Sequence, residues 1–198
     1  MPAIETDTIC AIATPVGRSG IGIVRLSGPD VAKACEELLG FLPSPRHAHY
    51  CDFLDADQTV IDQGVAIYYQ SPDSFTGEDI LELQGHGGVY VLNAVLERVL
   101  LLDIRLAGPG EFSERAFLND KIDLLQAEAI ADLIDANSKQ AVQSAMRTLR
   151  GQFSELVHHL VTMLTTIRVS VEAAIDFSDE DIDLMADAKV EESIEETL

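Results

Sequence analysis

The apolar positions of this chain follow two different periods, and the change between them falls near Asp123. Upstream, short runs rich in isoleucine and valine are separated by turns, which predicts strands, and two amphipathic segments have helical spacing. We therefore expect the first part of the chain to be a mixed α+β domain. The predicted strands cover Ala11–Thr14, Gly22–Leu26, His47–Leu54, Gly64–Tyr69 and Asp79–Gln84, and the predicted helices cover Pro29–Leu39 and Val89–Leu102.

Downstream of Asp123 the apolar residues recur at helical spacing throughout. Asp123 and Asn137 are each followed three positions later by a glutamine, a pattern that marks the start of a helix. Steps of three and four then continue over Val142–Ala174, which is typical of a bundle or coiled-coil seam. Gly151 is expected to interrupt this run at a modest cost, and Leu184–Leu198 is expected to begin another helix.

These two periods predict two domains. Residues 1–120 are expected to form the α+β domain, and residues 121–198 are expected to form the first part of a helical domain that is incomplete. The length of 198 residues and the apolar content of 47% are those of a globular chain that can bury a proper core.

The net charge of the chain argues against one class of partner, the nucleic acids. It carries 34 acidic against 13 basic residues, a net charge of −21. Affinity for a nucleic acid depends on lysine and arginine displacing counterions from phosphates, so this chain alone is expected to bind tRNA poorly. Cys10, Cys35 and Cys51 form no C-x-x-C pair and are odd in number, as in proteins with reduced thiols. With neither a signal-peptide pattern nor a run long enough to span a membrane, we expect a cytoplasmic location.

Most candidate sites fail on spacing. The glycines of Gly17–Gly22 read G-x-x-G-x-G, which does not fit the dinucleotide fingerprint, and no phosphate-binding loop of the G-x-x-x-x-G-K-[ST] type occurs. His47, His49 and Cys51 alternate along a predicted strand, but a fourth metal ligand is not evident. The acidic run Asp179–Asp183 lacks the glycine and the closing glutamate of a calcium loop. We therefore expect neither a metal site nor a catalytic residue in this chain.

Two segments remain as candidates for a site. The first, Ser74–Gly88, reads SFTGEDILELQGHGG; if Leu81 and Leu83 face the core, Glu82 faces the opposite side, because strand side chains alternate. The second, Gly108–Lys121, reads GPGEFSERAFLNDK and places charges and aromatic rings between the two predicted domains. An exposed strand carboxylate and a plain connector are the alternative interpretations of these segments.

Three stretches together resemble one family. DTICAIATPVGRSGIGIVRLSGP at Asp7–Pro29, SFTGEDILELQGHGG at Ser74–Gly88 and PGEFSERAFLNDKIDLLQAEAIADLIDA at Pro109–Ala136 are similar to the MnmE (TrmE) family of tRNA-modification GTPases. The resemblance implies an N-terminal domain similar to the folate-binding domain of aminomethyltransferases, which forms a homodimer, followed by a helical domain. It also implies that the full protein acts with the flavoprotein MnmG on the wobble uridine of certain tRNAs, adding an aminomethyl or carboxymethylaminomethyl group.

The resemblance further implies a site for formyl- or methylene-tetrahydrofolate at Arg25, Glu82 and Lys121, with Gly20 and Arg115 as further candidates. The residue types suit this ligand. A carboxylate such as Glu82 can accept paired hydrogen bonds from the amino group and ring N–H of a pterin. Arg25 and Lys121 can hold carbonyl, formyl or carboxylate oxygens.

The departures from the family are equally informative. The family's phosphate-binding loop and C-terminal cysteine motif are missing from this sequence, so we expect the sites for GTP, magnesium and potassium to lie outside it, and we expect no GTP hydrolysis by this chain alone. Any contact with tRNA is expected through the full complex. Two alternatives stay open: a stand-alone folate-dependent aminomethyltransferase-like protein, and a dimerising scaffold that binds no ligand.

Overall fold

The computed structural model describes residues 7–15 and 17–176, and these residues form two compact units that divide between Ile122 and Asp123. The first unit is built on a β-sheet, and the second is helical. This is the predicted fold class, an α+β domain followed by a helical domain, and it is confirmed. Within the described residues, no helix combines the length and the apolar character needed to cross a membrane.

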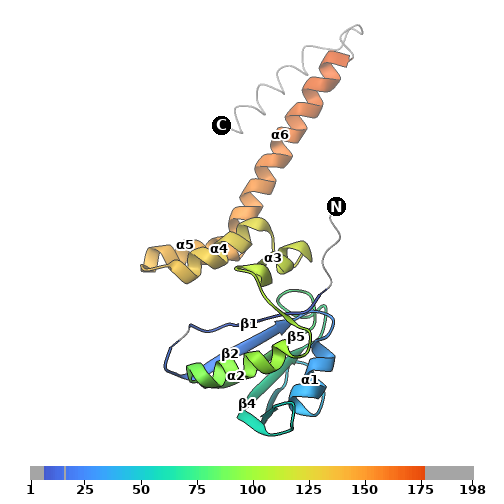
Figure 1. Ribbon diagram of the computed structural model, residues 1–198. Helices are drawn as coiled ribbons and strands as arrows, with labels where there is room; N and C mark the ends of the chain where they lie inside the picture. Colours follow the sequence, from blue (N-terminus) through green and yellow to red (C-terminus); the bar gives the residue numbers. More distant parts are fainter. Residues whose placement is uncertain (1–6, 16, 177–198) are drawn as a thin grey trace. The chain divides into compact units, whose positions relative to one another are not determined.

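The first unit has a six-stranded sheet with the order β3-β4-β5-β2-β1-β6 (Figure 1). Every neighbouring pair is antiparallel except β1 and β6, which are parallel. All five predicted strands are present, whereas β6 was not predicted because two residues are too few to show a period. The strands are β1 (Ile9–Ile12), β2 (Ser19–Ser27), β3 (Ala48–Leu54), β4 (Val60–Tyr69), β5 (Ile80–Gly87) and β6 (Arg105–Leu106).

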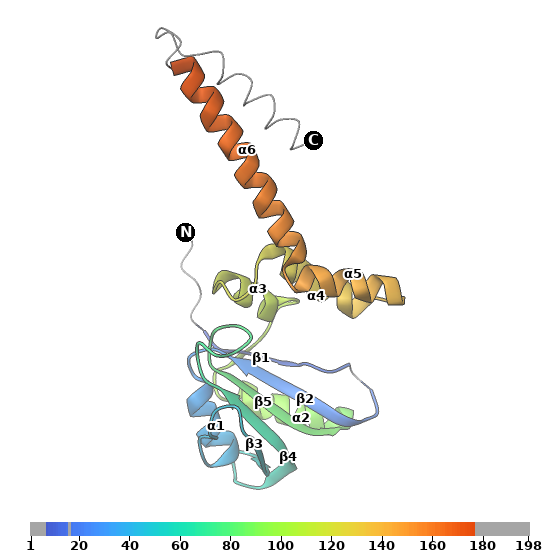
Figure 2. The same ribbon diagram turned by 180° about the vertical axis from the view of Figure 1, so that it is seen from behind.

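Helices α1 (Val31–Leu39) and α2 (Val89–Leu100), both predicted, share one hydrophobic core with the sheet. Helix α2 lies in front of the sheet in Figure 1 and behind it in Figure 2, so it covers one face. Leu81 and Leu83 of β5 belong to this core and are 0% and 1% exposed. Because side chains alternate along a strand, Glu82 points to the opposite face, as predicted. The candidate site is built on that second face.

Helix α3 (Glu111–Leu118) lies in the segment that was interpreted as a charged connector. It begins after Gly110, whose φ of 76° is in the left-handed region. Of its eight residues only Arg115 and Ala116 are buried, so the sequence shows no apolar stripe from which a helix could be predicted.

The second unit contains α4 (Leu124–Asp135), α5 (Lys139–Leu149) and α6 (Gln152–Asp176). The predicted capping box at Asp123 is confirmed: its carboxylate accepts a hydrogen bond from the Gln126 N–H at 2.8 Å, and the Gln126 side chain accepts one from the Asp123 N–H at 2.9 Å. The second predicted start was wrong by one residue. Ser138, not Asn137, caps α5, and its hydroxyl accepts from the N–H three residues later.

The predicted run over Val142–Ala174 is divided into two helices at Gly151, where an interruption was expected. Gly151 has a φ of 83°, a left-handed conformation that ends a helix rather than bending it, so the chain changes direction between α5 and α6. The prediction considered only the low helix propensity of Gly151. The end of α5 instead depends on the ability of glycine to adopt a left-handed conformation.

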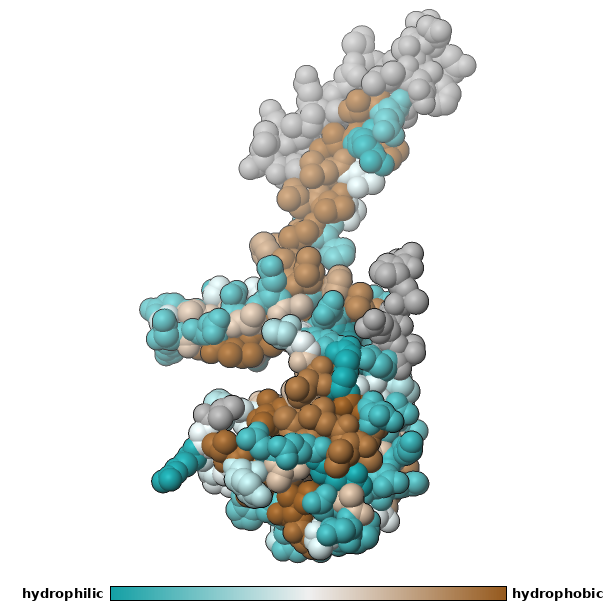
Figure 3. All heavy atoms as spheres, viewed as in Figure 1, coloured by the Kyte–Doolittle hydropathy of each residue, from teal (hydrophilic) through white to brown (hydrophobic). Residues whose placement is uncertain are grey.

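Helix α6 keeps the predicted apolar periodicity but leaves it uncovered. Leu156, Leu160 and Leu164 are 67%, 45% and 51% exposed, and Figure 3 shows apolar side chains along this helix. The predicted helix over Leu184–Leu198 lies outside the described residues.

Replacing Asp123 with alanine should destabilise α4, because the Gln126 N–H loses its acceptor. We expect a loss of about 1 kcal/mol, measured as faster amide hydrogen exchange in the first turn of α4. Asp132→Ala is the matched control, since this aspartate is exposed in the interior of the same helix. Equal effects of the two substitutions would show that the cap does not stabilise the helix.

Candidate functional site

The second face of the sheet carries an ion pair between Arg25 and Glu82. The two residues are directly opposite each other on the antiparallel strands β2 and β5. The Nε and Nη2 atoms of Arg25 both donate to Oε1 of Glu82, at 3.0 and 2.8 Å. The Arg25 side chain is 30% exposed and that of Glu82 12%, so the carboxylate is held in a partly dry place with its charge balanced.

The other carboxylate oxygen of Glu82 is less occupied. Among the described residues, Oε2 accepts one hydrogen bond, from the side-chain amide of Gln84 at 3.2 Å. A carboxylate has about four lone-pair positions, so Glu82 retains capacity for further donors. A ligand with adjacent N–H groups fits this acceptor.

Aromatic rings lie beside this ion pair. The ring of Phe112, from α3, has its centroid 5.7 Å from Cζ of Arg25, within the range of a cation–π contact. The ion pair also affects Tyr69 of β4. Burial and then the negative charge of Glu82 raise the pKa of its phenol, so the hydroxyl stays protonated at neutral pH. Neither residue was predicted, although the alternation of β4 gave a signal for Tyr69.

The neighbouring strands supply aliphatic walls. Ala11 of β1 is the register partner of Arg25, and Ile67 of β4 is the partner of Glu82. All four residues therefore lie in one row across the second face. A polar pair between small and aliphatic side chains suits a flat, partly polar ligand.

Lys121, which follows α3, packs against the loop between β4 and β5. Its Nζ donates to the carbonyl oxygen of Pro72 at 2.8 Å. Its methylene stem passes close to Gly77, where a Cβ would lie 3.2 Å from Cγ of Lys121. Among the described residues no hydrogen bond or ion pair joins Lys121 to Arg25 or Glu82, so the structure brings together two of the three predicted ligand residues and packs the third against this loop.

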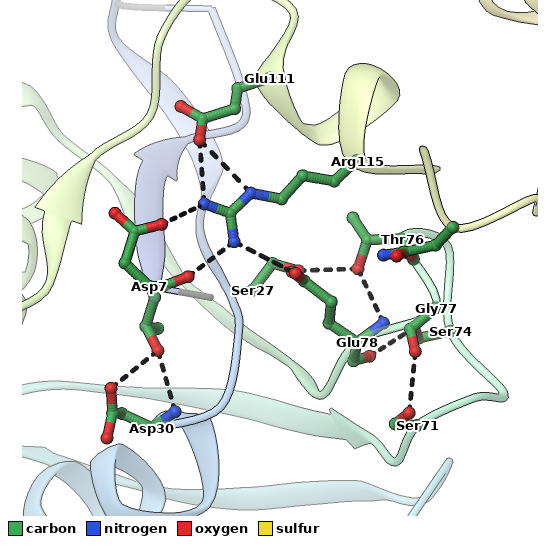
Figure 4. Close-up of polar contacts among 12 residues, drawn as sticks. Asp7, Ser27, Asp30, Ser71, Ser74, Thr76, Gly77, Glu78, Glu111 and Arg115 are labelled. Carbon is green, nitrogen blue, oxygen red and sulfur yellow. Dashed lines mark hydrogen bonds and ion pairs between the residues drawn. The ribbon is translucent and has the colours of Figure 1, made fainter. Parts of the chain in front are cut away.

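Arg115, a further candidate, is fully engaged by other groups. Its guanidinium, 6% exposed, lies among the carboxylates of Asp7, Glu78 and Glu111 (Figure 4). Nη1 also donates to the backbone carbonyl of Asp7 at 2.7 Å. A buried cation with these partners fixes the segments that carry them, and removing one partner would leave an uncompensated charge. Within the described residues its hydrogen bonds go to this cluster and not to the Arg25–Glu82 pair.

The loop before β5 is fixed by the same network. The hydroxyl of Ser27 donates to Glu78 at 2.7 Å and shares a 2.7 Å hydrogen bond with Thr76 (Figure 4). The side chain of Asn119 donates to the carbonyl of Thr76 at 2.8 Å. The loop that carries the Lys121 contact is thus anchored to β2 and to the residue that follows α3.

Gly20 is exposed in β2, and a Cβ built on it would meet nothing within 4 Å. The packing therefore does not require a glycine here, and its role as a pocket wall stays a prediction. Gly22 differs, because a Cβ there would lie 2.6 Å from Leu92.

The alternating residues considered for a metal are not brought together. His47 lies before β3, the Nε2 of His49 accepts from the Ser44 N–H at 3.2 Å, and Cys51 packs against the core. No cluster of three or more possible metal ligands exists within residues 7–15 and 17–176. The acidic run Asp179–Asp183 lies outside the described part of the chain.

The thiols of Cys10 and Cys35 are buried, which raises the pKa of the first to about 11 and of the second to about 12. At neutral pH both are therefore protonated and poorly nucleophilic.

Both units of the chain match known protein families. Residues 8–121 match the family model described as GTP-binding protein TrmE N-terminus, and residues 124–198 match the MnmE helical domain. Three relatives bear the name tRNA modification GTPase MnmE: those of Chromohalobacter salexigens, Shewanella woodyi and Pectobacterium carotovorum, which are 59%, 56% and 58% identical. Each match covers 96% of this chain but only 41–42% of the relative, so the chain spans about two fifths of their length.

The Glu111 carboxylate makes the free energy of unfolding depend on pH in the acidic range. A hydrogen bond from Arg105 outweighs burial and lowers the pKa of Glu111 to about 2 from an ordinary value of 4.5. Because the folded state has the lower pKa, the stabilisation is complete above pH 4.5 and is lost as the pH falls toward 2. Glu111→Gln should therefore cost on the order of 2 kcal/mol at pH 7, with the difference shrinking across that window.

Urea unfolding at a series of pH values measures this difference. Glu114→Gln is the matched control, since Glu114 is exposed on the same helix. A Glu111→Gln chain that keeps the acid dependence of the wild type would contradict the assignment.

Proposed function

The chain belongs to the MnmE (TrmE) family, and on that premise we propose that it is the N-terminal portion of a tRNA-modification GTPase that binds a formyl- or methylene-tetrahydrofolate. The observation that carries the proposal is the Arg25–Glu82 pair, whose carboxylate is 12% exposed on the uncovered face of the sheet. A structural ion pair needs no open acceptor, whereas Glu82 retains one.

The chemistry of the ligand matches the site. The amino group and ring N–H of a pterin donate to Glu82, while Arg25 fixes the carboxylate and offers its remaining N–H groups to ring oxygens. Phe112 supplies an aromatic face near the ring. Lys121, which packs against the loop that the buried network anchors, is proposed to hold a carbonyl or formyl oxygen.

The proposed role of the whole protein is wider. With MnmG it would modify the wobble uridine of certain tRNAs, with GTP, magnesium and potassium bound outside this chain. The net charge of −21 supports RNA contacts elsewhere in the complex. The exposed stripe of α6 favours a module over a stand-alone aminomethyltransferase, and the Arg25–Glu82 pair favours a ligand-binding module over a scaffold without ligand.

Glu82→Gln should abolish folate binding while preserving the fold. The substitution keeps the side-chain volume and an acceptor for Arg25, but it removes one acceptor oxygen and the negative charge. Two charge-assisted hydrogen bonds are lost or weakened, so we expect affinity for 5-formyltetrahydrofolate to fall roughly 100-fold or more in calorimetry.

Glu97→Gln serves as the control, because this glutamate is exposed on α2, against the other face of the sheet. Unchanged affinity in the Glu82→Gln chain would exclude Glu82 as the pterin ligand. An unchanged thermal unfolding transition separates loss of the ligand from loss of the fold.

The same chain is proposed to form a homodimer through its first unit. Large apolar side chains exposed on that unit support this, including Ile21 at 65% and Tyr90 at 86%. Light scattering should give twice the chain mass of 21.5 kDa, for the wild type and for Glu82→Gln alike. A monomer at micromolar concentration would contradict dimerisation.

A further inference from the structure

His86 is held in one orientation by Asp62. Nδ1 of His86 lies 2.7 Å from Oδ1 of Asp62, and Oδ2 of the same carboxylate accepts the backbone N–H of His86 at 2.7 Å. The Asp62 side chain is 9% exposed, whereas that of His86 is 72% exposed. The ring is thus fixed through Nδ1 and presents Nε2 outward.

This arrangement requires a glycine. A Cβ on Gly85 would lie 2.3 Å from Oδ2 of Asp62, so any other residue at this position would displace the carboxylate. Burial would raise the pKa of Asp62, but hydrogen bonds from the backbone and ring of His86 prevail and lower it, so the group stays ionised. A side chain held only for packing would need neither the charge nor this space.

His86 extends the row of polar residues on β5. Glu82, Gln84 and His86 are two residues apart, so they share the second face of the sheet. Their flanks are aliphatic: Ile23 of β2 and Val65 of β4 are both register partners of Gln84. At a rise of about 3.3 Å per residue, His86 lies about 13 Å along the strand from Glu82.

Arg18 adds a permanent positive charge at the same end of the face. It is exposed in the turn directly before Ser19, and Ser19 is the register partner of Gly87. A chain with only 13 basic residues among 198 thus places an arginine and an oriented histidine next to the paired positions Ser19 and Gly87, where the polar row ends.

We infer that His86 and Arg18 form a subsite for the glutamate carboxylates of the folate tail. The inference rests on the proposed function, in which Glu82 holds the pterin. A separation of about 13 Å exceeds the reach of a two-ring pterin, so the tail is the part of the ligand that arrives at His86. When protonated, the imidazole donates Nε2–H to a carboxylate while Asp62 balances the charge behind it.

The test compares three ligands by calorimetry on the full chain: 5-formyltetrahydropteroate, which lacks glutamate, 5-formyltetrahydrofolate, and its triglutamate. The wild type should bind the glutamate forms about fivefold or more tightly than the pteroate, the effect of partly exposed charge pairs. His86→Ala and Arg18→Ala should each reduce this ratio toward one while leaving the pteroate affinity unchanged. His47→Ala, an exposed histidine outside the row, should keep the wild-type ratio.

The outcomes separate this inference from the proposed function. Equal affinity of the wild type for all three ligands, or a ratio unaffected by His86→Ala and Arg18→Ala, would overturn the subsite while leaving the pterin site in place. Failure of the wild type to bind any of the three ligands would overturn both. Thermal unfolding of the variants identifies any that lose the fold, and Arg18→Ala, in an exposed turn, is the variant least exposed to that risk.

Discussion

The buried guanidinium of Arg115 is the interaction on which the first unit depends. It joins Asp7 before β1, Glu78 before β5 and Glu111 at the start of α3, three segments that are distant in the sequence. Removing one carboxylate from such a cluster leaves a charge without its partner in a dry place, which costs more than the pair itself contributes. Glu111 is the neighbour of Phe112, and Glu78 lies at the end of the loop under Lys121, so this cluster fixes segments on both sides of the proposed site.

Much of this architecture could be predicted from local patterns. The strands, α1, α2 and the Asp123 cap follow from alternation, helical spacing and a pair of side chains three residues apart, and the outward direction of Glu82 follows from Leu81 and Leu83. Helix α3 could not be predicted in this way, because its buried residues are a charged arginine and an alanine, and their partners come from elsewhere in the chain. Gly151 shows the same limit: propensity gave its cost, but its left-handed conformation decided where α5 ends.

The candidate site likewise has features that the sequence predicts and features that it does not. The resemblance to a family gave Arg25 and Glu82, and the sheet register explains why they meet: they are cross-strand partners. Lys121 was predicted with them, yet its contact is with Pro72, a relation that no spacing in the sequence indicates. The pairing of Asp62 with His86 was equally hidden, since the two are 24 residues apart and the geometry depends on a missing side chain at Gly85.

The crowding at Gly85 has a consequence for how the family can vary. A methyl group at this position would displace the Asp62 carboxylate from His86, and it would also lie 3.1 Å from the ring of Phe53. A substitution at Gly85 is therefore expected to release His86 from its fixed orientation even where the aspartate is kept. A lineage that carries such a substitution would have an imidazole that rotates, and the proposed subsite would need another way to orient its donor.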